Sequence, residues 1–364
     1  MTIRQQVISL TDSGLSLKEA FLEVSKLRGV QIDSIRRAYG KQTRIHEKAT
    51  ALNVNVSDIK HGWIKDKEAS FFFKNPDFKS EDKDNFKDEL ISLVESRSPY
   101  IQNILYQNDD AKYLLVIDPA DIHLGKLSSE FETGENYDTL IAVKRVKEGV
   151  TSLIQRSSIY DIERIVLIVG NDILHTDTPK RTTTAGTNQD TCGMWYDNFM
   201  IGFKLYSDII ELMSLIAPVH VIFNPSNHDF TSGFYLAQMV SAYFSNNLNV
   251  TFDCDMKHRK YFVFGRNLIG TTHGDGAQQK DLALLMAHES GQGWADSVFR
   301  YWYIHHFHHK IAKDYMSVTV ESLRSSSSAD GWHHRNGFVH SHKSIEAFIH
   351  HKDLGQVARY CHYF

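Results

Sequence analysis

Residues 113–125 read YLLVIDPADIHLG, in which an apolar run leads into a short polar stretch that closes on Gly125. The apolar run at 113–117 predicts a buried strand. Asp121 and His123 stand two residues apart in the loop that follows, so both side chains can turn toward one ion. The sequence therefore predicts a strand that delivers two metal-competent side chains at its carboxyl end.

The same combination recurs four times further along the chain. The β-rich runs at 165–169, 219–223, 267–270 and 301–304 are each followed by side chains that can bind a metal ion. In α/β sheets the carboxyl ends of the strands form one edge where ligands bind, so clusters that are distant in sequence can meet in space. The four further clusters are Asp172, then Asn227 with His228 and Asp229, then His273, then His306 with His308.

Longer helical stretches separate these runs, which favours an α/β fold with a two-sheet β sandwich flanked by helices over residues 111–364. The apolar runs on either side of Gly265 predict a hairpin, and 314–320 predicts one further strand. The four serines at 325–328 favour a flexible surface loop.

A small helical module is expected at residues 1–45. Ser16 and Glu19 form a capping box and Gly29 ends the helix that they begin, with flanking helices expected at 3–10 and 32–39. This is helix-turn-helix spacing, and residues 1–44 carry a net charge of +4. DNA contact and a three-helix packing or oligomerisation module with a solvated basic face both fit these features.

Residues 46–110 are expected to connect the two parts. The segment at 60–76 predicts a short hairpin, and the segment at 80–99 predicts an amphipathic helix.

Composition narrows the function classes. The formal net charge of −4 gives the whole chain no attraction to polyanions, so a nucleic-acid contact needs a local patch. The start lacks a secretory signal and no apolar run could span a membrane, so we expect a soluble, cytoplasmic protein without membrane contact. Three widely spaced cysteines exclude a disulfide framework and a cysteine-rich zinc site, whereas 20 histidines supply imidazole for metal binding and proton transfer.

Each cluster by itself is an ordinary turn, but the ordered set of five is much more specific. It resembles the calcineurin-like metallophosphoesterase superfamily, whose blocks read D-x-H, G-D-x-x-D, G-N-H-D, G-x-x-H and G-H-x-H. The resemblance covers about residues 112–310. The stretch NHDFTSGFYLAQM at 227–239 and the GND form of the second block also look like bacteriophage-encoded members.

The resemblance implies a two-metal site and a role for each matching residue. Asp172 would bridge the two ions, His228 would be the proton donor, and Asp229 would orient His228. One metal would be held by Asp121, His123 and His308, and the other by Asn227, His273 and His306.

The chain departs from the family pattern at several positions. His175 replaces the second aspartate of the second block, and it is expected either to touch substrate or to support the ligands from behind. Ser226 and His305 replace glycines in the third and fifth blocks, next to Asn227 and His306. His305 and His309 are expected to be bystanders, and the histidines of the tail, from His333 to His351, are expected on the surface.

The expected function is two-metal hydrolysis of a phosphodiester, with Mn²⁺ favoured and Fe or Zn²⁺ also suited to aspartate, asparagine and imidazole donors. The basic N-terminus and the resemblance of DIHLGK at 121–126 to the first block of DNA-repair nucleases favour nucleic acid as the substrate and partner. A small-nucleotide or cyclic-nucleotide phosphodiesterase is the nearest alternative, followed by a protein phosphatase. A DNA-binding protein with a vestigial metal site is the alternative outside the enzymes, and a homo-oligomer is compatible with all of these.

Overall fold

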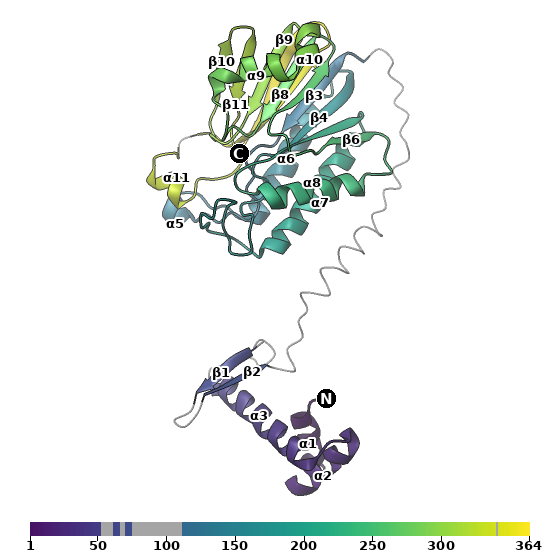
Figure 1. Cartoon of the computed structure of the whole chain (residues 1–364), viewed down its shortest axis with the longest axis vertical. Coiled ribbons are helices and arrows are strands. Elements are labelled where there is room, and N and C mark those ends of the chain that lie inside the picture. Colours follow the sequence, from purple (N-terminus) through teal and green to yellow (C-terminus); the bar gives the residue numbers. More distant parts are fainter. Residues whose placement is uncertain (52–60, 66–69, 75–110, 340) are drawn as a thin grey trace. The chain divides into compact units, whose positions relative to one another are not determined.

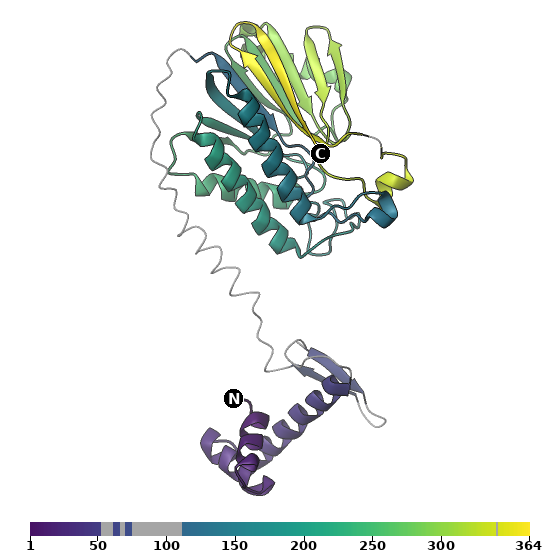
Figure 2. The same cartoon turned by 180° about the vertical axis from the view of Figure 1, so that it is seen from behind.

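The computed structural model describes residues 1–51, 61–65, 70–74, 111–339 and 341–364, and it contains two compact units, Met1–Ser96 and Arg97–Phe364 (Figures 1 and 2). The expected helix at 80–99 lies outside the described residues. None of the helices in the described segments is long and apolar enough to cross a membrane.

Three helices form the described core of the smaller unit. They are α1 (Ile3–Asp12), α2 (Leu17–Arg28) and α3 (Ile32–Ala51). Ser16 and Glu19 satisfy each other's backbone N–H groups at the start of α2, and Gly29 ends this helix in the left-handed conformation. The three helices bury a small apolar cluster made of Val7, Ala20, Phe21, Val24 and Ile35.

The third helix and the hairpin of this unit can be compared with what the sequence predicts. The third helix is longer than the expected 32–39, and it crosses the expected module boundary at residue 45. The hairpin expected at 60–76 is present as β1 (His61–Lys65) paired with β2 (Ser70–Lys74). Propensity therefore located both elements, but it missed the continuation of α3 because the polar residues after Tyr39 give a weak apolar period.

The larger unit contains two mixed sheets. The six-stranded sheet has the order β13-β12-β3-β4-β5-β6 and the five-stranded sheet has the order β10-β11-β9-β8-β7. The strands are β3 (Tyr113–Asp118), β4 (Ile162–Gly170), β5 (Val219–Asn224), β6 (Val250–Asp253), β7 (Lys260–Phe264), β8 (Asn267–Thr272), β9 (Phe299–Ile304), β10 (Ile311–Tyr315), β11 (Val318–Ser322), β12 (Ser344–His351) and β13 (Gly355–Tyr363). The expected two-sheet α/β fold is thus confirmed, as is the hairpin of β7 and β8.

Helices cover the outer faces of the two sheets, giving four layers (Figures 1 and 2). The apolar faces of the long helices pack on the six-stranded sheet, while α9 packs on the other sheet. The helices are α5 (Glu130–Thr133), α6 (Thr139–Ser157), α7 (Trp195–Ser214), α8 (Phe230–Tyr243), α9 (Leu282–Glu289), α10 (Gly291–Asp296) and α11 (Gly331–Arg335), with a 3₁₀ turn at Gln279–Asp281.

Strand β3 explains why its sequence is a continuous apolar run. Leu115 and Ile117 point to the helix side, whereas Leu114 and Val116 point to the layer between the sheets. Side chains alternate across a strand, so a strand buried on both faces needs apolar residues at every position.

Three further expectations for this unit are corrected. The single strand expected at 314–320 is two strands, β10 and β11, joined by a turn in which Met316 has positive φ. The serines at 325–328 are buried. The Ser325 hydroxyl donates a hydrogen bond to the Asp121 carbonyl, and Arg145 of α6 donates one to the Ser326 carbonyl at 2.8 Å. His350, expected on the surface, is fully buried on β12, where burial lowers its pKa to about 3.

Candidate metal centre

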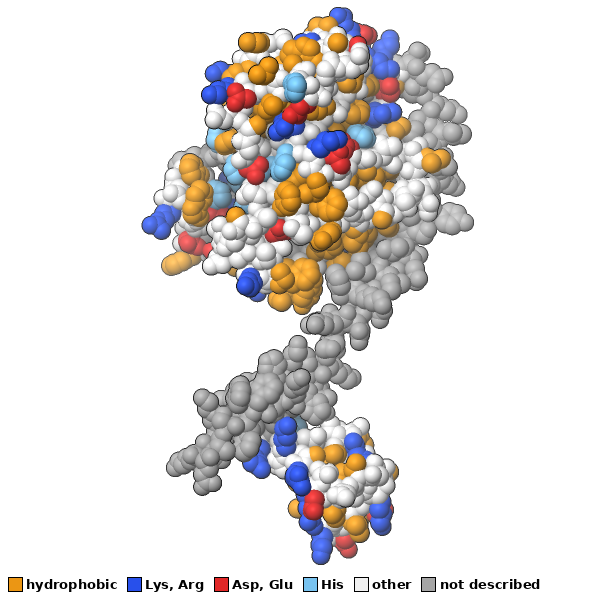
Figure 3. Space-filling view, viewed as in Figure 1, with side chains coloured by type: hydrophobic (Ala, Val, Ile, Leu, Met, Phe, Trp, Pro, Cys, Tyr) orange, Lys and Arg blue, Asp and Glu red, His pale blue; other side chains and the backbone are white. Residues whose placement is uncertain are grey.

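The carboxyl ends of five strands meet at one place. Strands β3, β4 and β5 belong to the six-stranded sheet, while β8 and β9 belong to the five-stranded sheet, so the donors come from both layers. Figure 3 shows several exposed histidine side chains on the visible face of the larger unit. All seven residues that the resemblance implies as metal ligands converge here.

The first donor group consists of Asp121, His123 and His308, whose ligand atoms lie within 4.8 Å of one another. His308 Nε2 lies 3.5 Å from Asp121 Oδ1 and 3.3 Å from His123 Nε2. Burial lowers the pKa of both imidazoles, which favours the neutral form whose lone pair binds a cation.

The second group consists of Asp172, His273 and His306, again within 4.8 Å, and Asn227 joins it through Oδ1, which lies 2.8 Å from His273 Nε2. Asp172 Oδ2 lies 3.3 Å from His273 Nε2 and 3.9 Å from His123 Nε2. One Asp172 carboxylate oxygen therefore faces both groups.

Charge on the second group supports a shared carboxylate. Burial opposes protonation of His273, but the Asp172 carboxylate outweighs it and raises the pKa of His273 to about 9. Burial likewise opposes ionisation of Asp172, yet the neighbouring His273 and His228 hold the pKa of this carboxyl well below its usual range. A cation that replaces the His273 proton would meet an ionised, buried carboxylate.

The donor atoms fit divalent cations. Oxygen and imidazole nitrogen donors without thiolate suit Mn²⁺, Fe or Zn²⁺. Two imidazole nitrogens, His123 Nε2 and His308 Nε2, face each other at 3.3 Å, and a cation between such groups satisfies both lone pairs.

Backbone strain is concentrated at this centre. Among the described residues other than glycine, eight have positive φ, and six of these belong to the loops of the site. These six are Asp121, His123, Asn171, Asp172, His306 and His308. Residues held in the left-handed region each cost on the order of 1–3 kcal/mol and persist where the surroundings fix them, commonly at functional sites.

Two hydrogen-bonded pairs join the sheets beneath the donors. His305 Nε2 lies 2.9 Å from Asp118 Oδ1, both fully buried, which ties the end of β9 to the end of β3. Thr271 donates its hydroxyl hydrogen to Asn224 Oδ1 at 2.9 Å, which ties β8 to β5. The His305 side chain belongs to neither group of candidate ligands, but it is not the bystander that was expected, because it joins the two sheets beneath the site.

His175 lies next to two histidines of the site. Its side chain is buried, and its Nδ1 lies 3.3 Å from His123 Nδ1, on the far side of the His123 ring from the donor group. Its carbonyl oxygen accepts a hydrogen bond from His228 Nδ1 at 3.0 Å. His175 therefore supports two site residues, and its ring forms a third group with His123 and His228 in which the ligand atoms lie within 4.8 Å of one another.

The orienting role expected for Asp229 is corrected. Asp229 Oδ1 accepts a hydrogen bond from the Ser226 hydroxyl at 2.6 Å, and Oδ2 accepts one from the Leu174 N–H at 2.8 Å. Neither oxygen contacts the His228 ring, which is oriented by the His175 carbonyl instead. Ser226, in place of the family's glycine, also accepts the Asp172 N–H at 2.8 Å and so connects two loops of the site.

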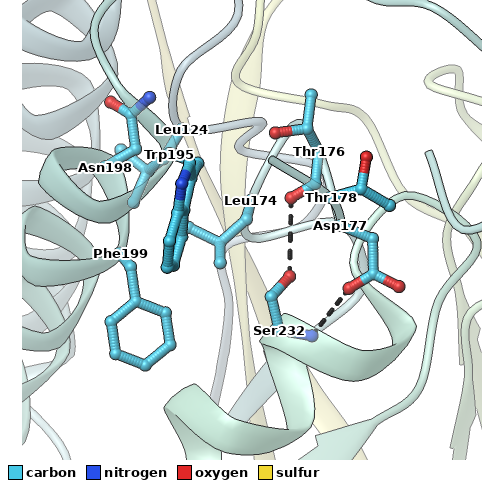
Figure 4. A pocket seen from close by; sticks show the side chains of 9 residues that line it. All are labelled: Leu124, Leu174, Thr176, Asp177, Thr178, Trp195, Asn198, Phe199 and Ser232. Carbon is cyan, nitrogen blue, oxygen red and sulfur yellow. Dashed lines mark hydrogen bonds between the residues drawn. The ribbon is translucent and has the colours of Figure 1, made fainter. Parts of the chain in front are cut away.

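A pocket lies beside the centre, and Asp177 in its lining holds the segment that follows His228 (Figure 4). Asp177 accepts hydrogen bonds from the N–H groups of Thr231 and Ser232, at 3.0 and 2.7 Å, at the start of α8. Leu124 and Leu174, each one residue from a site histidine, line the apolar side with Trp195. Asp177 thus holds α8, which directly follows the loop of Asn227 and His228.

Three residues that no sequence pattern indicated lie at the rim of the centre. His333, expected on the surface, stacks on His308 with ring centroids 5.2 Å apart and planes at 12°. Asp330 binds His333, and the fully buried Lys126 forms an ion pair with Asp330 at 3.1 Å. Lys126 directly follows Gly125 in the first block, but no pattern in the sequence links it to residues more than 200 positions later.

Comparisons with known proteins give likeness in fold only. No protein-family model matches the chain, and a search of curated proteins finds no match. Solved structures that it resembles include an archaeal phosphodiesterase at 9% identity and TM-score 0.31, covering 69% of this chain and 99% of that one. Vps29 of Entamoeba histolytica, complexed with zinc, has 11% sequence identity and a TM-score of 0.29, and the match covers 69% of this chain and 98% of that one. A predicted phosphoesterase of Streptococcus pneumoniae has 11% identity and a TM-score of 0.27, with the same two shares covered.

Proposed function

We propose that this chain is a two-metal phosphoesterase of the calcineurin-like class that hydrolyses phosphodiester bonds in nucleic acid. The observation that carries this proposal is the convergence of aspartate, asparagine and histidine donors from five loops onto two adjacent groups that share Asp172. A carboxylate that faces two groups of ligands is the arrangement that two neighbouring cations require, and an ordinary polar cluster does not require it.

Each candidate ligand has a proposed role. Asp121, His123 and His308 would hold one cation, Asn227, His273 and His306 the other, and Asp172 both. When bound, the pair supplies an activated water and neutralises the phosphoryl oxygens. Mn²⁺ is the ion that we expect.

His228 supplies the proton for the leaving group. Its Nδ1–H donates to the His175 carbonyl at 3.0 Å, which fixes the ring and leaves Nε2 as the atom that meets substrate. The backbone N–H of His228 donates to Asp172 Oδ1 at 3.0 Å, so the proton donor is positioned directly against the bridging carboxylate. A protonated His228 then gives its Nε2 proton to the departing oxygen.

A panel of substrates tests the reaction class. We expect the purified chain to take up about two equivalents of Mn²⁺, as a two-ion centre requires. It should then cleave single-stranded DNA, duplex DNA or RNA faster than cyclic nucleotides or phosphopeptides, and chelation should stop the reaction. Metal is measured by mass spectrometry and products by gel and chromatography. A chain that binds no metal after loading would support the non-enzymatic alternative, and preference for cyclic nucleotides would replace nucleic acid as the substrate.

The smaller unit supplies a candidate grip for the polymer. Arg37, Lys41 and Arg44 are exposed on α3 at intervals of four and three residues, which places them on one helix face. Figure 3 shows Lys and Arg side chains on the visible surface of this unit. Three cations in a row can each displace a counterion from a phosphate backbone.

Replacing these three residues with glutamine tests the grip. We expect weaker DNA binding and a dependence of log K on log salt that is shallower by about 2 to 3, because each lost phosphate contact removes about 0.7 to 0.9 from the slope. Cleavage of a small phosphodiester should not change. The matched control replaces Lys144, Lys147 and Lys204 of the larger unit, and an equal loss in this control would contradict a specific role for α3.

A further inference from the structure

The short helix α11 is anchored to the metal centre by a buried ion pair. Lys126 has a side chain that is 1% exposed, and its Nζ lies 3.1 Å from Asp330 Oδ2. Taking an ammonium group out of water is costly unless it is paired, so this contact holds Asp330 in place. Because Lys126 follows the loop of Asp121 and His123, the beginning of α11 is fixed to that loop.

The ring of His333 forms a second contact between α11 and the metal centre. Asp330 Oδ1 accepts hydrogen bonds from the His333 backbone N–H at 2.9 Å and from His333 Nδ1 at 2.7 Å. The oriented His333 ring then stacks on His308 at 5.2 Å. The segment from Asp330 to His333 is therefore docked against a donor residue of the centre.

This docked segment presents large aromatic side chains to solvent. Trp332 is 63% exposed and Phe338 is 60% exposed, and their ring centroids lie 5.8 Å apart with planes at 32°. Trp332 also contacts the His333 ring edge-to-face at 5.2 Å. A line of ring contacts thus runs from His308 through His333 to an exposed aromatic pair.

We propose that Trp332 and Phe338 form a stacking subsite for an unpaired nucleobase of the substrate, next to the phosphate that is cleaved. This inference deepens the proposed function and rests on it. An exposed indole offers a flat π face that any base can cover, and base–aromatic stacking tolerates every sequence. A base in a duplex has both faces occupied, so the subsite favours a single strand or a frayed end.

One cation near the pair fits the same occupant. Arg335 is exposed on α11, three residues after Trp332, where its guanidinium can meet the phosphate of the neighbouring nucleotide. The metal centre beyond His333 takes the phosphate that reacts. A nucleic acid strand likewise carries each base between two phosphates.

Binding to paired oligonucleotides tests the subsite without turnover. A labelled single-stranded DNA and the same strand with abasic sites are titrated, by fluorescence anisotropy in the presence of chelator, against the wild type and Trp332→Ala. We expect the substitution to raise the Kd for the base-bearing strand by about 5- to 150-fold, the range that loss of one base stack implies. The Kd for the abasic strand should hardly change, and Trp332→Phe should restore most of the loss.

Tyr235→Ala is the matched control, since Tyr235 is 60% exposed on α8 and belongs to neither α11 nor the donor groups. The proposal is overturned if Trp332→Ala binds the base-bearing strand like the wild type, if both strands are weakened equally, or if neither strand binds the wild type. Equal weakening of a phosphopeptide would also overturn it, in favour of a peptide-binding rim. If base-dependent binding is lost in Trp332→Ala while the wild type cleaves no phosphodiester, the subsite stands and the proposed activity fails.

Discussion

Replacing Asp172 with alanine is expected to remove both metal binding and hydrolysis. Asp172 Oδ2 faces His273 at 3.3 Å and His123 at 3.9 Å, so it is the donor that both groups share. Loss of a partner behind a ligand already costs roughly 10- to 100-fold in metal affinity or activity, and loss of a shared donor should cost more than that. The measurements are Mn²⁺ content by mass spectrometry and hydrolysis of bis-p-nitrophenyl phosphate.

The control for this substitution is Asp296→Ala, which removes an exposed carboxylate of α10. It should keep wild-type metal content and rate. Asp172→Ala that retains two ions and hydrolyses the ester at the wild-type rate would remove the basis for a shared centre.

Replacing His228 with alanine is expected to separate metal binding from turnover. The hydrogen bond from residue 228 to Asp172 comes from the backbone N–H, so alanine keeps it. The donors stay in place while the proton donor is lost, and turnover should fall by about 10²- to 10⁴-fold, the contribution of general acid catalysis. Metal content should remain at the wild-type value.

The leaving group provides the sharper measurement for His228. A p-nitrophenolate departs without needing a proton, whereas a sugar oxygen needs one. His228→Ala should therefore slow cleavage of a dinucleotide far more than cleavage of a p-nitrophenyl ester. Equal slowing of both substrates would argue that His228 positions substrate and does not protonate it.

The sequence alone predicted most of the scaffold and a set of candidate donors. Strands such as β3 were found because burial on both faces requires a continuous apolar run, and candidate donors such as Asp121 and His273 were chosen because they directly follow such runs. The patterns are local, so one sequence suffices to find them. The structure then places the implied donors in two groups, with Asp172 facing both.

What the sequence could not predict depends on contacts between distant segments. His305 looks like one histidine among several, and only the packing of two sheets brings it to Asp118. The serines at 325–328 have the composition of an exposed loop, but they are buried and form hydrogen bonds with Asp121 and Arg145, which are distant in sequence. Asp229 follows His228 directly, yet its carboxylate turns toward Ser226 and Leu174, which adjacency cannot reveal.

Two hydrogen-bonded pairs join the sheets beneath the site, Asp118 with His305 and Asn224 with Thr271. Because the donors are divided between two stacked sheets, their spacing depends on how those sheets are seated on each other. A change of volume deep between the sheets, for instance where Tyr303 stacks on Phe348 at 4.0 Å, can alter the proposed reaction without touching any candidate donor. Under the proposed function, close variants can therefore differ in activity although all of their candidate donors are the same.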